Sequence, residues 1–452
     1  MRRIEVSLAK VLLLLLALPW VGTLLIVDSG LTWMARASAV EFTTPTCLET
    51  ATLEELITCI VGQMPGRDSE GFVVPTSTEQ SDWRSVIAQM LSDQCDDINL
   101  PASLSGIYSV GTFNDAGNGQ SYCALIEILD EDGNGKVDRG WGTFILNPNP
   151  SRELSIHIAH PIADSRTEDQ GIDVFKGTNS RSFLMAGTHR DANSTLSACQ
   201  PSEVEADVAH NVANMFQPTV QDLLNFYEAI GVEFVAIQFH GHAPSSCPGL
   251  DVYLTYGRPT PPSPGDKLLE LQSNLLAHNP DWTVTVPGDT PSCTLHGSTN
   301  VQGRLLNGVA AENVCTIAAS SYSGRFIHIE QKAGFRNAGD WVGAINDTWP
   351  AASTVSLSVT PPTIPPGGTL TATWSGIAAP TPTDWLGLYV PGADNAELLA
   401  WRYTTGDASG SVPFELPGTL APGTYELRLL ANDGFTLLAT SDAFTVTEEH
   451  YC

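Results

Sequence analysis

The feature that most constrains this chain is an alternation of short apolar runs with helical segments between about residues 106 and 350. Runs such as ELSIHIAH and EFVAIQFHG have the length of strands, whereas TEDQGIDVFKG and TVQDLLNFYEAIG place apolar residues at helical spacing. Strands separated by helices indicate crossover connections. The sequence therefore predicts an α/β fold with a mixed, mostly parallel sheet flanked by helices. Further strands are predicted at YCALIEIL, WGTFILNP, SFLMAG, DWTVTVP and RFIHIEQ, and further helices at VEADVAHNVANMF, GDKLLELQSNLLAHN and 338–347.

The pattern differs on either side of this central region. Residues 40–105 contain TLEELITCIVGQM and SDWRSVIAQMLSDQC, which predict a small helical segment tied by disulfides. Residues 354–448 contain short alternating strands separated by Gly/Pro turns, which predict a separate all-β sandwich. The stretch around Asp384, Trp385 and Tyr389 resembles the immunoglobulin-like accessory domains of some secreted hydrolases. Its aromatic residues, Trp374 among them, are predicted to be core rather than a ligand platform.

The N-terminus has the three parts of a secretory signal peptide. A basic start precedes an apolar run from Val11 to Val27, and Ala37-Ser38-Ala39 provides a small-residue cleavage site. We therefore predict a signal peptide over 1–39 and a mature protein that is extracellular or periplasmic, with no stable membrane insertion after cleavage. The alternative is that the run stays uncleaved as an anchor.

Charge and cysteine usage agree with export. The formal net charge of -29 excludes nucleic acid as a partner, because such binding requires basic patches. Eight cysteines lie between 47 and 315, a number that suits four disulfides formed outside the cytosol, although spacing does not fix their connectivity. Cys452 is left over and is a candidate for pairing between chains.

Ionisable residues gather at the carboxyl ends of four predicted strands, where open α/β sheets bind their ligands. ELSIHIAH ends at His160, with Asp164 four residues later, and RFIHIEQ carries Glu330 at its end. The remaining residues at these strand ends are His189, Arg190, His240, His242 and Arg336. Four such strand ends are difficult to explain as core, so we expect a functional site.

The residue types suit zinc chemistry. A catalytic zinc ion takes three protein ligands from His, Asp or Glu and keeps one position open for water. His160, Asp164 and His240 would be the ligands, and Glu330 would be the general base. Arg190 would bind a substrate carboxylate.

Three more residues at the strand ends are candidates for substrate binding, and His242 is also an alternative to His240 as a ligand. These residues are His189, His242 and Arg336. The predicted partner is a small-molecule or peptide-like substrate that carries a carboxylate.

This order of motifs resembles the zinc carboxypeptidase superfamily in its broad sense, which includes N-formylglutamate amidohydrolases and poly-γ-glutamate hydrolases. The resemblance implies that His160 and Asp164 match the first ligand pair, His240 the later histidine and Glu330 the base. It also implies that Arg190, in GTHRDAN, holds the substrate carboxylate. The sequence departs from that pattern by having Asp at the second ligand, at a spacing of four and after Pro161.

Other polar residues have structural explanations that compete with functional ones. His157 lies in an apolar alternation and is expected to pack in the core, and His328 suits either a core or a substrate role. His210 follows Asp207 by three residues on a predicted helix, which suits a metal pair or an ordinary hydrogen bond.

The acidic stretch DEDGNGKVDRGW partly matches a calcium-binding loop. It places Asp130, Asp132, Asn134 and Asp138 at ligand positions of a weak Ca²⁺ site. Trp141 stands where that loop requires a bidentate Glu, so a plain hairpin turn is the favoured interpretation.

The sequence thus predicts a secreted zinc-dependent hydrolase of an amide or peptide-like bond. Two alternatives stay open, a secreted phosphoesterase and a non-catalytic surface binding protein. No G-x-S-x-G motif or phosphate-binding glycine loop is present, which disfavours serine hydrolases and nucleotide-binding proteins.

Overall fold

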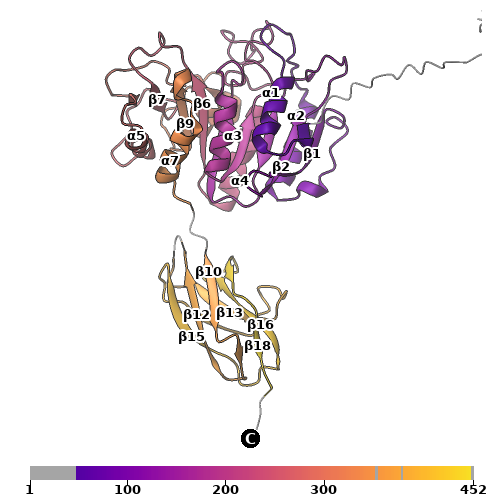
Figure 1. Ribbon diagram of the computed structural model, residues 1–452, viewed down its shortest axis with the longest axis vertical. Helices are drawn as coiled ribbons and strands as arrows, with labels where there is room; N and C mark the ends of the chain where they lie inside the picture. The colour runs from indigo at the N-terminus through magenta and orange to yellow at the C-terminus, as the bar shows by residue number, and fades with distance from the viewer. Residues whose placement is uncertain (1–46, 352–354, 378–379, 449–452) are drawn as a thin grey trace, which may run out of the picture. The chain divides into compact units, whose positions relative to one another are not determined.

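The computed structural model describes residues 47–351, 355–377 and 380–448, so the predicted signal peptide and Cys452 lie outside the described residues. Residues up to 350 form a nine-stranded sheet in the order β1-β2-β3-β5-β4-β6-β9-β7-β8 (Figure 1). Its strands are β1 (Tyr108–Asn114), β2 (Ser121–Glu127), β3 (Thr143–Leu146), β4 (Arg152–Ile158), β5 (Ser180–Met185), β6 (Val235–Gly241), β7 (Val252–Thr255), β8 (Val284–Thr285) and β9 (Phe326–Gln331).

The sheet is mixed, and its parallel part is central. Strands β5, β4, β6 and β9 run parallel to one another. The hairpins β1-β2-β3 extend the sheet antiparallel on one side, and β7 pairs antiparallel with β9 on the other. The predicted α/β class is confirmed, and the sheet is evenly mixed, since four neighbouring strand pairs are antiparallel and four are parallel.

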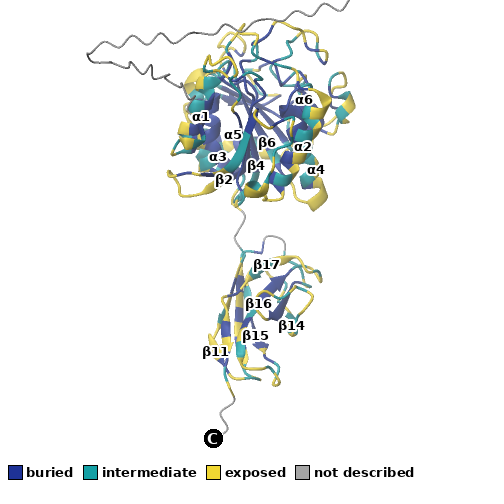
Figure 2. Ribbon diagram, turned by 90° about the vertical axis from the view of Figure 1, so that its right-hand side faces the viewer, coloured by how far each residue is buried: buried dark blue, intermediate teal, exposed yellow. Residues whose placement is uncertain are grey.

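Helices cover both faces of the sheet. They are α1 (Leu53–Gln63), α2 (Ser77–Leu91), α3 (Thr167–Gly177), α4 (Phe216–Ile230), α5 (Lys267–His278), α6 (Val301–Leu306) and α7 (Ala338–Thr348). Short 3-10 turns lie at Cys47–Glu49, Cys95–Asp97, Ala311–Asn313 and Ala333–Phe335. Figure 2 shows α1 and α3 on one side of the sheet and α2, α4 and α6 on the other. The segment before residue 105 therefore supplies one helix to each face.

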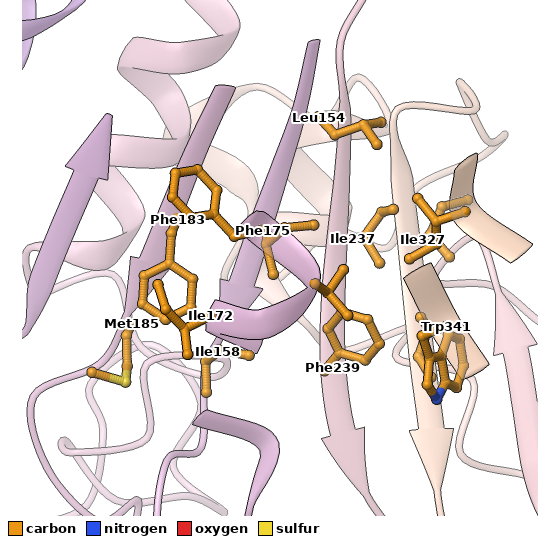
Figure 3. Close-up of a cluster of buried hydrophobic side chains, with 14 of the residues drawn as sticks. Leu154, Ile158, Ile172, Phe175, Phe183, Met185, Ile237, Phe239, Ile327 and Trp341 are labelled. Atoms are coloured by element: carbon orange, nitrogen blue, oxygen red, sulfur yellow. The ribbon is translucent and has the colours of Figure 1, made fainter. Parts of the chain in front are cut away.

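Each face has its own apolar core. On one face, Ile172 and Phe175 of α3 pack against β4 and β5, and the rings of Phe175 and Phe183 lie 6.1 Å apart (Figure 3). Trp341 of α7 is fully buried in the same cluster. On the other face, Trp83 of α2 is buried and donates its indole N–H to Thr219 of α4 at 2.8 Å. Burial of this kind contributes about 25 cal/mol for each Å² of apolar surface removed from water.

The chain order creates a crevice at the centre of the sheet. From β4 the chain crosses through α3 to β5 on one side, and then through α4 to β6 on the other side of β4. The two crossovers lie on opposite faces, because α3 belongs to one core and α4 to the other. Such a reversal of direction is where open α/β sheets bind ligands, at the carboxyl ends of the strands.

One predicted helix is wrong. VEADVAHNVANMF, residues 204–216, forms a series of turns up to residue 215, and only its last residue belongs to α4. Its polar side chains cap local backbone groups, since Asp207 accepts the N–H of Ala209 and Asn211 that of Ala213. Such local bonds compete with helical ones. The strand predicted at DWTVTVP is also shorter than expected, and β7 and α6 were not predicted.

Four disulfides are present, as predicted. Cys47–Cys59 and Cys95–Cys123 join neighbours in the sequence, whereas Cys199–Cys315 encloses Cys247–Cys293. Such bonds persist in oxidising compartments. Among the described residues, no helix has the length and apolar character needed to cross a bilayer.

The C-terminal residues form two β-sheets around a core that includes Leu386, Leu388 and Leu427. Trp374 and Tyr389 are buried, which confirms them as core residues. One sheet has the order β10-β12-β15, and the other has the order β11-β18-β16-β13-β14 with β17 on β16. The strands are β10 (Ser356–Thr360), β11 (Thr363–Ile364), β12 (Thr369–Ser375), β13 (Trp385–Tyr389), β14 (Ala400–Tyr403), β15 (Gly410–Glu415), β16 (Gly423–Leu430), β17 (Leu437–Thr440) and β18 (Phe444–Val446).

Candidate metal centre

The parallel strands bring the predicted site residues to one edge of the sheet. His240 near the end of β6 lies directly opposite Glu330 of β9 in the strand register. His160 follows the end of β4 by two residues, and Arg190 follows β5. The loop after His160 turns back on itself, with the N–H of Asp164 donating to the carbonyl of His160 at 3.0 Å. This turn places the Asp164 carboxylate beside the histidine.

Three of these side chains form a compact triangle. The Nδ1 atoms of His160 and His240 are 3.0 Å apart. Asp164 Oδ2 lies 3.2 Å from Nδ1 of His160 and 3.5 Å from Nδ1 of His240. Ligands that surround a tetrahedral zinc ion at about 2.0–2.2 Å are separated by roughly 3.3–3.5 Å. The predicted ligand set is thus brought together at distances that fit one metal ion.

The far nitrogen of each imidazole is held by a hydrogen-bond acceptor. His160 Nε2 lies 2.9 Å from Oδ1 of Asp207, a carboxylate that is 1% exposed. His240 Nε2 lies 2.8 Å from Oε1 of Gln238, whose oxygen also accepts from Asn300. A carboxylate and an amide oxygen can only accept, so both Nε2 atoms carry hydrogen and both Nδ1 atoms can offer a lone pair to a metal.

Two lone pairs 3.0 Å apart repel unless a proton or a cation lies between them. In the metal-free protein, a proton between the two nitrogen atoms removes this repulsion. Burial alone would lower the pKa of His160, but Asp207 and Asp164 raise it to about 9. Burial lowers the pKa of His240 to about 4. The hydrogen bond from the charged His160 holds the pKa of Asp164 well below its ordinary value despite burial. Binding of a metal at this point would displace the proton between the two imidazoles.

Glu330 lies beside the triangle. Burial, together with the charge of Asp164, raises the pKa of Glu330 to about 8. Its Oε1 is 3.7 Å from Nε2 of His328, and its buried Oε2 has no hydrogen-bond partner. Ligand atoms of His240, His328 and Glu330 all lie within 4.8 Å of one another. Glu330 also lines the same cavity as the triangle, so one bridging water could connect it to a molecule bound there.

A cavity of about 240 Å³ opens over these residues. The loop 294–300 covers one side and passes so close to His328 that a Cβ on Gly297 would lie 2.7 Å from His328 Cδ2. Five of the ten histidines of the chain line this cavity: His160, His210, His240, His296 and His328. The cavity also presents Asp164, Arg190 and Glu330, so it combines metal ligands, an acid or base and a cation.

Arg190 lies at the side of His160, with Nη1 3.3 Å from its Nδ1. Its other terminal nitrogen contacts the buried carboxylate of Asp207 and lies 3.6 Å from Glu203. The side chain is 29% exposed, so the guanidinium is fixed at one end and accessible at the other. This geometry suits a group that receives an anionic part of a ligand.

The other predicted substrate-binding residues do not line the cavity. Nδ1 of His189 accepts the N–H of Asp191 at 3.0 Å, and Nδ1 of His242 lies 2.9 Å from the carbonyl of Ala243. Arg336 donates to the carbonyls of Ser165 and Gln331. Arg336 therefore links the end of β9 to the loop that carries Asp164 through these hydrogen bonds.

Two histidines illustrate what the sequence could and could not locate. His157 is fully buried, with Nε2 2.9 Å from Ser155 Oγ and its ring packed edge-on against Phe216, as expected of a core residue. His210 lies on a turn rather than a helix and lines the cavity, with Nδ1 2.8 Å from Gln200 Oε1. The role of Asp207 beside His160 was missed, since a separation of 47 residues leaves no local signal.

The acidic stretch after β2 forms a turn in which carboxylates accept backbone N–H groups. Asp130 and Asp132 accept from Asn134, and Asp138 accepts from Glu131. The three carboxylates lie within 4.8 Å of one another. The hydrogen bonds account for the turn, and the predicted Ca²⁺ site stays a prediction.

Comparisons with known proteins do not place the chain in a family. No protein-family profile matches it, and no curated protein matches it. One similar solved structure is the gene product Atu2144 from Agrobacterium tumefaciens, with 11% identity, covering 44% of this chain and 87% of that chain, at a TM-score of 0.27. A TM-score this low establishes neither fold nor function.

Proposed function

We propose that the chain is a secreted zinc-dependent hydrolase that cleaves an amide or peptide-like bond. The observation that carries the proposal is the meeting of two imidazole Nδ1 atoms and one carboxylate oxygen at 3.0–3.5 Å, with both imidazoles anchored through Nε2. We also propose, from its sequence motifs, that the chain is similar to the zinc carboxypeptidase superfamily. Four disulfides support an oxidising compartment, in agreement with the predicted signal peptide.

The donor set favours zinc. Two imidazoles and one carboxylate, with room beside them, match the composition of catalytic zinc sites, whereas Ca²⁺ and Mg²⁺ prefer oxygen ligands throughout. His160, Asp164 and His240 would hold the ion. When bound, zinc would lower the pKa of a water molecule towards neutrality and polarise a carbonyl group.

Glu330 would act as the general base and then as the general acid. In the metal-free protein its raised pKa keeps it protonated at neutral pH. A nearby cation favours the ionised form of a carboxyl group, so a bound metal would convert Glu330 into a base. Its unpartnered Oε2 could accept a proton from the attacking water and deliver it to the leaving amine.

Arg190 would orient the substrate by binding a carboxylate. It is the guanidinium that lines the cavity, and Asp207 fixes one of its terminal nitrogens while the rest of the group stays accessible. An arginine provides paired donors that match the geometry of a carboxylate. The proposed substrates are therefore N-acyl amino acids or peptides with a free carboxylate near the scissile bond.

The test is hydrolysis by the purified, zinc-loaded protein. We expect amine release from N-acyl glutamates or γ-glutamyl peptides, little phosphate release from generic phosphate esters, and a loss of about 100-fold or more in kcat for Glu330→Gln with zinc retained. Asp340→Asn, which changes a partly exposed acid in the first turn of α7 outside the cavity, serves as the matched control. Phosphate release that exceeds amine release would support the phosphoesterase alternative instead. Absence of any turnover in zinc-loaded protein would support a binding protein.

A further inference from the structure

A second cavity of about 190 Å³ lies in the C-terminal β-sandwich, and four of its six lining residues are aromatic. Three of them are unusually exposed for large apolar side chains, with exposed fractions of 54% for Trp401, 40% for Tyr403 and 54% for Phe435. The full lining comprises Trp385, Leu398, Trp401, Tyr403, Asp433 and Phe435. Grouped exposed aromatic side chains of this kind mark binding sites more often than isolated ones do.

The strand register explains why the rings gather on one face. Trp385 of β13 pairs with Tyr403 of β14, and Gly387 pairs with Trp401, so these side chains point to the same side of the sheet. Leu386 and Leu388 point to the opposite side, into the sandwich core. The cavity is therefore formed on the outer face of the sheet.

The rings stand nearly perpendicular to one another. Trp385 makes edge contacts with Trp401 at an interplanar angle of 82° and with Phe435 at 79°. Trp401 meets Tyr403 at 78°. Trp385 is 6% exposed, and its indole N–H is bound to the carbonyl of Gly434, so it forms the fixed base of the cavity. Perpendicular rings enclose a compact group from several sides, whereas a flat sugar ring requires a coplanar platform.

A carboxylate lies at the same cavity. Asp433 sits in the turn between β16 and β17, where Asn432 and Asp433 both have left-handed backbone conformations (φ 45° and 54°) suited to a tight hairpin. The buried carboxylate of Asp384 accepts the N–H of Asn432 and holds the turn, while Tyr403 donates its hydroxyl to Asp433 at 2.7 Å. No Lys or Arg side chain is among the residues described as lining this cavity.

We infer that this aromatic cavity binds a methylated ammonium group, such as the trimethylammonium of choline. Aromatic faces attract a cation through their quadrupole, and cages of such rings recognise quaternary ammonium ions. Asp433 supplies a compensating negative charge, and the near absence of other polar side chains suits a cation that cannot donate hydrogen bonds. The inference is independent of the hydrolase proposal, because it uses no residue of the metal centre.

The experiment titrates the full-length protein with choline chloride and follows heat or tryptophan fluorescence. The ligand control is 3,3-dimethyl-1-butanol, which has the shape of choline without its charge. We expect choline to bind and the uncharged analogue to bind about tenfold more weakly or worse, as a cation–π contribution predicts. Trp401→Ala and Asp433→Asn should each weaken choline binding about tenfold. Leu437→Ala, which changes an exposed residue outside the cavity, should leave it unchanged.

Two further measurements complete the experiment. One distinguishes a lipid headgroup from free choline as the source of the ligand, and the other tests carbohydrates as a competing class of ligand. Phosphatidylcholine vesicles, compared with phosphatidylglycerol vesicles, show whether a lipid headgroup is accepted as well as free choline; either result supports the inference when free choline binds through Trp401. Equal binding of choline and its uncharged analogue would overturn it. So would binding of glucose or N-acetylglucosamine oligomers without choline, or equal effects of Trp401→Ala and Leu437→Ala.

Discussion

Replacing Asp207 with Asn tests whether the carboxylate behind His160 contributes to metal binding. The change keeps the size of the side chain and an oxygen that can accept from His160 Nε2, which now lies 2.9 Å away. It removes a negative charge that is 1% exposed and therefore weakly screened by water. The loss should lower the basicity of the imidazole and loosen its orientation.

The magnitude follows from the role of such partners in known metal sites. Loss of a carboxylate that orients a ligating histidine costs about 10–100-fold in metal affinity, or about 1.4–2.7 kcal/mol. We expect Asp207→Asn to fall within this range. The same change frees Arg190 from its contact with Asp207, so the kinetics of substrate binding should alter as well.

The assay is a competition for zinc between the protein and a chromophoric chelator at fixed pH. Asp222→Asn is the matched control, since Asp222 is also a largely buried acid in an ion pair, with Arg84, and does not line the cavity. It should leave zinc affinity unchanged. Equal affinities of wild type and Asp207→Asn, or equal losses in the two variants, would refute the reasoning.

Three further predictions concern pH, substrate binding and the loop over the site. Burial lowers the pKa of His157 to about 3 against about 6.5 in an unfolded chain, so its contribution to stability is present above pH 6.5 and is lost as the pH falls towards 3. When the pH falls from 7 to 5, the free energy of unfolding in urea, measured with chelator present, should decrease by about 2 kcal/mol more for wild type than for His157→Gln. Equal decreases would contradict this. Arg190→Lys should raise KM about tenfold for a substrate with a carboxylate and change KM little for its carboxamide analogue, because Lys lacks the paired donors; equal effects on both substrates would oppose the assigned role. Gly297→Ala should destabilise the fold by about 1–3 kcal/mol more than Gly308→Ala in urea, since both glycines have positive φ but only Gly297 is crowded, by His328; equal losses would show that crowding is unimportant.

The periodicity of the sequence was sufficient for most of the α/β fold. The strand pattern of residues 152–158 and 326–331 and the helical pattern of 167–177 agree with β4, β9 and α3. Placing ionisable residues at strand ends was also sufficient to bring His160, Asp164 and His240 together, because parallel strands share one edge.

The remaining features depend on long-range contacts or on local polar competition. The apolar spacing of residues 204–216 suggested a helix, yet the side chains of Asp207 and Asn211 cap turns, and Asp207 also supports His160. The loop 294–300 over the cavity has no periodic pattern, and only its packing on His328 reveals its position. The aromatic cavity of the sandwich was missed because Phe435 and Asp433 reach it from a separate hairpin turn.

The most direct test of the central claim is a measurement of which atoms bind zinc. Metal analysis of dialysed protein, followed by X-ray absorption or anomalous diffraction, should find one zinc ion per chain at this site. It should be bound by Nδ1 of His160, Nδ1 of His240 and a carboxylate oxygen of Asp164, and the ion should be lost in the double variant His160→Ala/His240→Ala. Stoichiometric zinc that survives in the double variant, or a wild-type protein that binds no zinc at the triangle, would contradict the account.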